Sequence, residues 1–503
     1  MGGVFVLDLI RDLPLSDPME YALRYFAQYP ALAFNWYLPG FYAAEAAMFS
    51  IFGASEAVAR GTVFIFCLIG ASVWFAWLRR GWGATVAFLA TALFLSPPLW
   101  NLWSRSVMLE APVVAMLIVS VWALQRYMDT PTWTRSIVAG AALAMALMIK
   151  QTAGFILPAL LLYALATPRR FVLWRWRALP AYLIVGVALL AVAAHAVKFG
   201  SQGLTSVLSD APIEAGGSTP RWSIDRWLLF PKVLIQTWGP YLTLLSAIGA
   251  LLPRRAGERY LPMIYLWLVC WYVAASLVLG GPNAARYTMY AFPALALLAV
   301  RPILYLQGMV WLHAAAVGLL VGGIGFNVWR SFDEPIPRLD GYRPVADFVH
   351  GTGTRAPILF AGKHDGNFIF HLRRLDDSRS HVVLRADKIL VSLAVHKYFG
   401  MQSHVASEAD IQALVERYGV EYIVIESPDI IKLKEFALLA RLVQGPAFER
   451  INTLPVQSAG GAVAPQRVEV YRLREFKAVN DVEIVIPLPH MGREIRFKPV
   501  QSR

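Results

Sequence analysis

Charged residues and cysteines are scarce in this sequence, and both shortages narrow the class of protein. Only 16% of the 503 residues are Asp, Glu, Lys or Arg, whereas about 25% is typical of a soluble domain. The two cysteines, Cys67 and Cys270, both lie inside apolar stretches. This pattern argues against a disulfide framework and leaves no CxxC spacing for a metal.

What is abundant is apolar surface. Hydrophobic residues make up 57% of the chain, the mean hydropathy is +0.51, and the apolar residues cluster in blocks of roughly 20, the length needed to cross a bilayer. Lys and Arg exceed Asp and Glu by 13, but they stand mostly in short loops between these blocks. That placement indicates membrane topology rather than a nucleic-acid-binding surface. We therefore expect a polytopic membrane protein with no nucleic-acid partner.

Ten apolar stretches predict spanning helices. They are residues 61–78, 83–99, 111–127, 135–149, 153–167, 179–197, 233–252, 260–280, 286–300 and 307–327. The loops on one side carry most of the arginines, which places that side in the cytoplasm. This alternation requires either that residues 34–53, an apolar segment broken by Pro39-Gly40, do not cross, or that an even number of crossings precedes Arg60. We favour a juxtamembrane segment along the outer face for 34–53. Residues 1–10 would be the remnant of a further first helix, for 11 spans in all.

After residue 327 the composition changes. Three short runs at 357–362, 421–426 and 468–473 predict strands, and residues 407–418 predict an amphipathic helix that begins with a capping serine and acids. We expect residues 1–327 to form the membrane domain, with 11–60 as its first outer loop and juxtamembrane segment. Residues 328–503 are expected to form a soluble α/β domain on the outer face.

Ionisable residues are rare in the middle of the spans and gather at the ends expected to face outward. This favours chemistry at the membrane surface over conduction through the bundle. A carboxylate there can accept a proton or hold a divalent metal ion, and Arg or Lys can neutralise a phosphate leaving group. The candidate carboxylates are Asp17, Glu20 and Glu110, and the candidate cations are Arg105, Lys150, Arg221 and Arg286.

These motifs, in this order, resemble the GT-C superfamily of integral membrane glycosyltransferases. The matching stretches are SDPMEYA (16–22), NWYLPGFYAAEAAMFSIFGASEAVAR (35–60), LSPPLWNLWSRSVMLEAP (95–112), AGAALAMALMIKQTAGFILP (139–158) and ARYTMYAFPALALLA (285–299). More narrowly, the sequence is similar to bacterial protein-mannosyltransferase-like and aminoarabinose-transferase-like enzymes. The resemblance covers roughly residues 16–300.

The resemblance implies an inverting transfer of a sugar from a polyprenyl-phosphate donor to a glycolipid, polysaccharide or protein, at the outer face of the bacterial inner membrane. It makes Asp17 the general base, with Glu20 in reserve, and Glu110 the second acid. Lys150, Arg286 and Arg105 would contact the donor phosphate, and Tyr21 and Trp103 the sugar or acceptor. One departure is that relatives often carry Lys-Pro-Pro where this chain has Tyr37-Leu38-Pro39-Gly40.

Each candidate also has a structural interpretation. Asp17 and Glu110 would cap helices, Arg105 would extend to the interface, and Lys150 and Arg286 would be interfacial anchors. Trp103 would belong to an aromatic belt, and His364 and Asp365 would be solvated loop residues. Other functions are a non-catalytic lipid-linked-sugar transporter or an envelope scaffold. The sequence identifies neither the sugar nor the acceptor, and a divalent metal would require Asp17 and Glu110 to converge.

Overall fold

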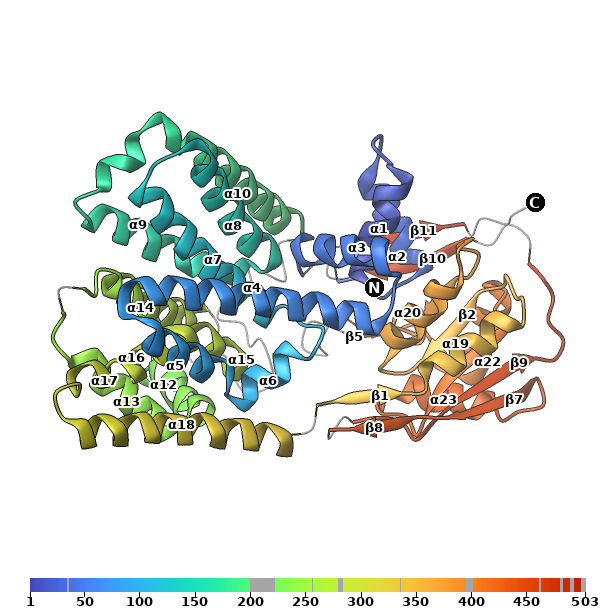
Figure 1. Cartoon of the computed structure of the whole chain (residues 1–503). Helices are drawn as coiled ribbons and strands as arrows, with labels where there is room; N and C mark the ends of the chain where they lie inside the picture. Colours follow the sequence, from blue (N-terminus) through green and yellow to red (C-terminus); the bar gives the residue numbers. More distant parts are fainter. Residues whose placement is uncertain are drawn as a thin grey trace. The chain divides into compact units, whose positions relative to one another are not determined.

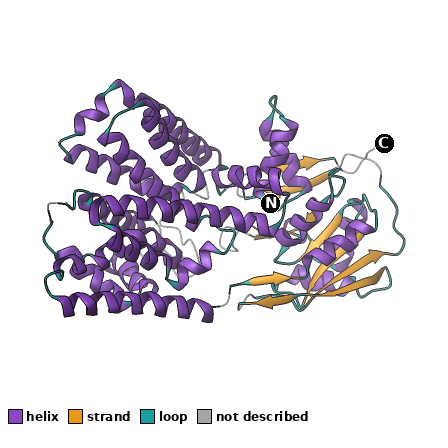
Figure 2. Cartoon of the chain, viewed as in Figure 1, coloured by secondary structure: helices purple, strands orange, loops and turns teal. Residues whose placement is uncertain are grey.

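The computed structural model describes all residues except 34–35, 200–221, 256, 279–283, 335, 394–400, 461–462, 480–482, 489–492 and 499–503. The chain forms two compact units. The helical unit is Phe34–Glu334, and the α/β unit combines Met1–Ala33 with Pro335–Arg503. Figure 2 shows the described strands confined to the α/β unit.

The helical unit is built from apolar helices joined by short turns (Figure 1). They are α3 (Gly40–Phe52), α4 (Glu56–Trp82), α5 (Ala84–Leu95), α6 (Pro98–Ser104), α7 (Glu110–Asp129), α8 (Trp133–Ile149), η1 (Gln151–Phe155), α9 (Ile156–Ala166), η2 (Arg170–Trp174), η3 (Trp176–Ala178), α10 (Leu179–Phe199), α12 (Ile224–Trp238), α13 (Pro240–Leu251), α14 (Leu261–Val278), α15 (Ala284–Thr288), η4 (Met289–Ala291), α16 (Phe292–Val300), α17 (Pro302–Tyr305) and α18 (Val310–Asp333).

Every predicted span coincides with helix, so a multi-pass membrane fold is confirmed. Within the described residues, six helices are long and apolar enough to cross a membrane, or eight if each of two bent pairs counts as one span. The pairs α5–α6 and α12–α13 bend by 72° and 113°, at a proline pair and at a Gly-Pro step that interrupt helical hydrogen bonding. The expected ten included α8 and the η1–α9 segment, which are shorter apolar helices.

The centre of the helical unit is formed by α7 and by residues 284–305, most of whose side chains are buried within the protein. Small residues allow the close packing there. A Cβ atom on Gly70 of α4 would lie 2.7 Å from Cβ of Ala115 on α7, so the two backbones are in direct contact. By contrast, α10 and α18 bury little of their surface. Their apolar side chains are therefore available to lipid.

The α/β unit contains a five-stranded sheet in the order β3-β2-β6-β9-β7. Strands β3, β2 and β6 are parallel to one another, and β9 is antiparallel to both of its neighbours, β6 and β7. The three predicted strands and the capped helix are confirmed. The remaining bounds are β1 (Arg338–Asp340), α19 (Tyr342–Gly351), β2 (Ile358–Ala361), α20 (Asp365–Leu375), β3 (Val383–Arg385), α21 (Ala386–Ile389), β4 (Val391–Leu393), β5 (Met401–Ser403), α22 (Glu408–Arg417), β6 (Tyr422–Ser427), α23 (Lys434–Leu442), β7 (Phe448–Pro455), β8 (Gln457–Ala459), β9 (Arg467–Leu473), β10 (Ile484–Leu488) and β11 (Arg493–Phe497).

Both faces of this sheet are covered by helices (Figure 1). Alternate residues of a strand point to opposite faces, and β2 is buried along its whole length. Phe360 stacks on Phe368 of α20, with ring centroids 5.2 Å apart. Leu359 instead belongs to the cluster that contains Ile411 of α22 and Leu439 of α23. The parallel strands are therefore sandwiched as in other α/β sheets.

The first 33 residues belong to the α/β unit, whereas the sequence placed them within a membrane domain of residues 1–327, with residues 1–10 as the remnant of a first helix. They form α1 (Gly2–Asp12) and α2 (Pro18–Gln28), and α2 packs against β3 and β11. Asp8 of α1 accepts hydrogen bonds from Arg373 Nη2 at 2.6 Å and Tyr25 Oη at 2.7 Å. These groups are buried and join α1, α2 and the end of α20.

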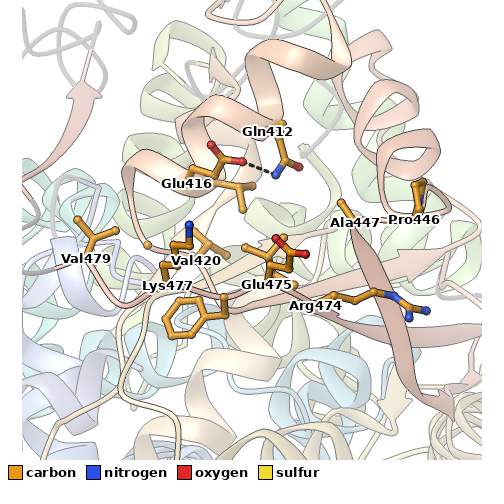
Figure 3. A pocket seen from close by; sticks show the side chains of 13 residues that line it. Gln412, Glu416, Val420, Pro446, Ala447, Arg474, Glu475, Lys477 and Val479 are labelled. Carbon is orange, nitrogen blue, oxygen red and sulfur yellow. Dashed lines mark hydrogen bonds between the residues drawn. The ribbon is translucent and has the colours of Figure 1, made fainter.

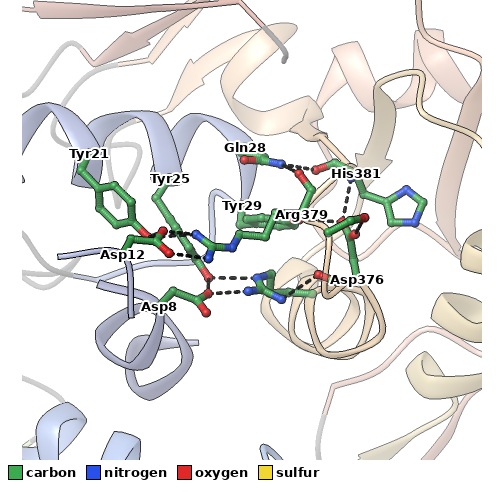
Figure 4. A network of polar contacts seen from close by, with 11 residues as sticks. Asp8, Asp12, Tyr21, Tyr25, Gln28, Tyr29, Asp376, Arg379 and His381 are labelled. Carbon is green, nitrogen blue, oxygen red and sulfur yellow. Dashed lines mark hydrogen bonds and ion pairs between the residues drawn. The ribbon is translucent and has the colours of Figure 1, made fainter. Parts of the chain in front are cut away.

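A second set of contacts extends the same junction (Figure 4). Asp12 pairs with Arg379 and accepts a hydrogen bond from Tyr21, and the bond from Arg379 holds the pKa of Asp12 at about 2. Asp376 accepts hydrogen bonds from Tyr29 Oη and from a backbone amide. Burial opposes ionisation of Asp376, but these bonds keep its pKa at about 2. The N-terminal helices are therefore held by several charged groups.

This junction constrains the topology. Because residues 1–33 and the C-terminal region form one compact unit, both must lie on the same side of the membrane. Residues 34–334 therefore cross the membrane an even number of times.

Candidate active site

Three of the expected site residues come together in the helical unit. Glu110, the first residue of α7, is only 1% exposed. Its Oε1 lies 2.6 Å from Nζ of Lys150 and 3.5 Å from Nε of Arg286. Lys150 is also buried, and the Arg286 side chain is 18% exposed. One carboxylate thus holds two cations from segments far apart in the sequence.

Breaks in the helices place these side chains. Glu110 stands in the first turn of α7, where the helix dipole favours a carboxylate. It does not cap the helix as the structural interpretation expected, because Leu109 is the N-cap residue and no side chain among the described residues caps α7. Lys150 has extended backbone between α8 and η1, and its side chain reaches Glu110 on α7. Arg286 lies in the short helix α15. Irregular backbone at membrane depth is tolerated only where it is buried in protein or lines a water-filled cavity.

Tyrosines complete the cluster, and sequence reasoning missed them as site residues. The ring of Tyr287 lies 4.9 Å from Lys150 Nζ and 5.1 Å from the Arg286 guanidinium carbon. The hydroxyl of Tyr290 is 2.9 Å from that of Thr152. The only signal for these tyrosines was their place in the stretch ARYTMYAFP.

Gly40 explains how the outer segment meets the cluster. A Cβ atom on Gly40 would lie 2.6 Å from the backbone carbon of Met148, so the start of α3 packs on the last turn of α8. Lys150 follows directly on that turn. The Tyr37–Gly40 stretch, which replaces the Lys-Pro-Pro of many relatives, is therefore positioned beside Lys150.

The cluster retains free polar groups. Among the described residues, Glu110 Oε2 and Arg286 Nε are buried without a hydrogen-bond partner. Two cations against one carboxylate leave one positive charge in excess. A phosphate oxygen fits this arrangement, because Arg and Lys both donate charge-assisted hydrogen bonds to phosphate.

A divalent metal does not fit it. In the part of the chain that the structure describes, no group of three or more His, Cys, Asp or Glu residues is placed to hold a metal ion. Glu110 already has two cations within 3.5 Å, and these would repel a divalent cation as a third positive group at the same carboxylate.

The other expected site residues lie elsewhere. Asp17 is exposed in the α/β unit and caps α2 by accepting the backbone amide of Glu20 at 2.9 Å. Glu20 is exposed and pairs with Arg24 at 3.7 Å. Tyr21 bonds Asp12 in the junction described above. The Asp17 cap was predicted, but the structure does not bring Asp17, Glu20 or Tyr21 into the helical unit.

Two further candidates are in the helical unit but outside the ion pairs. Arg105 ends α6, is exposed, and has no ion pair with the described residues. Trp103 packs against the apolar core, and its Nε1 is buried without a hydrogen-bond partner among the described residues. Arg221 lies outside the described residues. Only Glu110, Lys150 and Arg286 therefore form a cluster.

The expectation that His364 and Asp365 are solvated was wrong. Asp365 begins α20, is 8% exposed and lies 2.9 Å from Arg385. Burial raises the pKa of Asp365 to about 6, against the opposing effect of Arg385. His364 is 3.1 Å from the buried Glu426. Both residues follow β2 at the carboxyl edge of the parallel strands, which the sequence alone did not identify as buried.

The α/β unit also has a cavity of about 460 Å³. Figure 3 shows Glu416, Arg474, Glu475 and Lys477 around it, with Glu416 bonded to Gln412 at 2.7 Å. Charges of both signs surround this cavity. None of the expected site residues lines it.

Comparison with known proteins agrees with the architecture. Residues 39–197 match the family described as dolichyl-phosphate-mannose-protein mannosyltransferase, while no curated protein matches the sequence. The structure of ArnT from Cupriavidus metallidurans bound to undecaprenyl phosphate is similar, with a TM-score of 0.57 and 15% identity over 90% of this chain and 92% of that one.

Two other solved structures share the fold. Arabinofuranosyltransferase AftD from Mycobacteria has a TM-score of 0.54 at 14% identity, over 88% of this chain and 35% of that one. Archaeal oligosaccharyltransferase AglB from Archaeoglobus fulgidus, in complex with an inhibitory peptide and a dolichol-phosphate, has a TM-score of 0.50 at 11% identity, over 80% and 62%. The chain therefore has the fold of these solved structures, and the family match over residues 39–197 agrees with the resemblance indicated by its sequence motifs.

Proposed function

We propose that the protein is a membrane glycosyltransferase that moves a sugar from a polyprenyl-phosphate donor to a hydroxyl of an envelope glycolipid, polysaccharide or protein. The observation that carries this proposal is the buried Glu110–Lys150–Arg286 cluster. Two of the structures with this fold contain a polyprenyl or dolichol phosphate, which supports a lipid-linked phosphate as the ligand of the cluster.

In this reaction the bond between the anomeric carbon and the phosphate oxygen breaks, and its electron pair stays on the phosphate. Lys150 and Arg286 stabilise the charge that develops there. Glu110 acts as a positioning residue, because its carboxylate orients both cations and limits their excess charge to one. A limited excess allows the product phosphate to leave after transfer.

The acceptor hydroxyl attacks the opposite face of the sugar and loses its proton to a carboxylate, so the anomeric configuration inverts. Asp17 is the proposed base on the strength of the family resemblance, with Glu20 in reserve. Asp17 Oδ1 accepts the Glu20 amide, which leaves Oδ2 for the acceptor proton. We place the protein in a bacterial inner membrane with the α/β unit on the outer face.

Purified full-length protein in nanodiscs, given radiolabelled undecaprenyl-phosphate sugar and envelope extract as acceptor, tests the proposal. Wild type should release or transfer the label, and Lys150→Gln and Arg286→Gln should each lose about 100-fold or more. Arg330→Gln is the control, since its exposed pair with Glu334 is worth little. Movement of the uncleaved donor across liposomes would instead identify a transporter.

A further inference from the structure

The helical unit has a pocket of about 350 Å³ at the end of α7 opposite to Glu110. α7 contains 20 residues, so at 1.5 Å per residue its ends are about 30 Å apart. That distance equals the thickness of a bilayer's hydrocarbon core. The pocket therefore faces the other side of the membrane from the candidate active site, where the arginine-rich loops predicted to be cytoplasmic meet.

Three arginines and one aspartate line this pocket. Arg169 and Arg259 both pair with Asp129. Arg254 donates through Nε to the backbone oxygen of Glu258 at 3.3 Å and has no ion pair with the described residues. Three guanidinium groups against one carboxylate leave two positive charges in excess, so the pocket is complementary to an anion.

The loop that carries Arg254 and Arg259 is anchored to the helical unit through the buried side chain of Glu258. Glu258 accepts hydrogen bonds from Nε and Nη2 of Arg301, both at 2.8 Å, and from Trp82 Nε1 at 3.2 Å. Arg301 and Glu258 are almost fully buried. The chain between Arg254 and Arg259 is therefore anchored at Glu258 by buried hydrogen bonds.

Gln125 provides independent evidence for a ligand. It is 4% exposed and lines the pocket. Trp77 Nε1 lies 2.5 Å from Gln125 Oε1, and because an indole N–H only donates, the oxygen must face Trp77. The Nε2 group is then a buried donor without a partner among the described residues. A buried unpaired donor is destabilising unless an acceptor binds there.

The segment after Arg169 places the pocket's opening at headgroup depth. η2 and η3 expose Phe171, Trp174 and Trp176, which are 66%, 80% and 81% accessible. Arginines 170, 175 and 177 are interspersed among these rings. Aromatic rings alternating with arginine are typical of a chain that lies in the interface of an anionic membrane. This surrounding favours a lipid headgroup over a soluble anion.

We propose that this pocket binds the phosphate of an anionic phospholipid headgroup. Arg254 and the free Nε2 group of Gln125 donate to its oxygens, and the bound lipid links the ends of α7 and α9 to the loop before α14. Basic pockets between transmembrane helices on the cytoplasmic side bind anionic headgroups in other membrane proteins. This proposal does not depend on the transfer reaction.

Native mass spectrometry of the full-length protein, titrated with phosphatidylglycerol or phosphatidylcholine, tests this assignment. Gln125→Glu keeps the acceptor for Trp77 and the side-chain shape, but it replaces the free donor with a carboxylate oxygen that repels a phosphate. Arg254→Gln removes a cation with few protein contacts. Each should weaken phosphatidylglycerol binding about tenfold, whereas the exposed Arg79→Gln at the same face should stay within twofold of wild type.

Three results would overturn the proposal. Both pocket variants could bind phosphatidylglycerol as tightly as wild type, or phosphatidylcholine could bind equally well. Phosphatidylglycerol could fail to bind to wild type while sodium phosphate, added alone, does bind and loses its binding in Arg254→Gln. That combination would indicate a site for a free anion. Thermal unfolding of each variant confirms that the protein compared is folded.

Discussion

Replacing Arg373 with methionine tests the junction that joins the N-terminal helices to the α/β unit. The Arg373 side chain is 6% exposed and the Asp8 side chain 2%. Besides its bond to Asp8, Arg373 donates through Nε to Tyr25 Oη at 3.2 Å and through Nη1 to the Asp376 backbone oxygen at 2.8 Å. Methionine retains most of the side-chain volume, so the principal loss is the positive charge beside a buried carboxylate.

The size of the effect follows from that buried charge. Removing one partner of a buried ion pair costs about 3–5 kcal/mol. We therefore expect opening of α1 to become about 1000-fold more favourable in Arg373→Met at pH 7.

Hydrogen–deuterium exchange of the full-length protein at pH 7 measures this opening, through the protection factors of α1 and α2 peptides. Arg374→Met is the matched control, since this neighbouring arginine has no ion pair among the described residues. The Asp8→Asn, Arg373→Met double variant should recover part of the lost protection, because it no longer buries an unpaired carboxylate. Unchanged protection of α1 in Arg373→Met at pH 7 would refute the assignment of residues 1–33 to the α/β unit.

Three other perturbations have defined outcomes. Arg301→Met leaves the buried Glu258 unpaired and should lower the free energy of unfolding by about 3–5 kcal/mol; a thermal melt within 1 °C of wild type would contradict this. Gly249→Ala places a Cβ atom 1.8 Å from the backbone oxygen of Leu298, so size-exclusion chromatography should show less monodisperse protein than wild type. Gly61→Ala is the control, because a Cβ atom at Gly61 has no neighbour within 4 Å. Because the pKa of Asp365 is raised to about 6, its contribution to stability is present below pH 4 and is lost as the pH rises through about 6. The melting temperature of Asp365→Asn should therefore depend less on pH between pH 4 and 7 than that of wild type. A melting profile identical to that of wild type would contradict this assignment.

Apolar block length predicted the helical unit well, because only helices satisfy the backbone of a chain in lipid. The strand at 421–426 and the capped helix after Ser407 were predictable for a similar reason, since their signals are local. Helix bends were less visible: the Gly239-Pro240 step turns one predicted span into α12 and α13. The sequence also suggested that Glu110, Lys150 and Arg286 share a site, because each stands at the same expected end of a span.

The position of residues 1–33 could not be predicted. Asp8 and Arg373 are 365 positions apart, and no local pattern pairs an N-terminal acid with one particular arginine of the tail. For the same reason Asp365 was read as solvated, since its burial depends on Arg385 and the sheet above it. Tyr287 and Tyr290 were missed because an aromatic in an apolar run is ordinarily a packing residue.

The most direct test of the central claim is the affinity of the purified protein for undecaprenyl phosphate compared with undecaprenol, which lacks the phosphate. If Lys150 and Arg286 bind the lipid-linked phosphate, wild type should prefer undecaprenyl phosphate by at least about tenfold, and Arg286→Gln should lose most of that preference. Equal affinity of wild type for the two lipids, or an unchanged preference in Arg286→Gln and Lys150→Gln, would contradict the account.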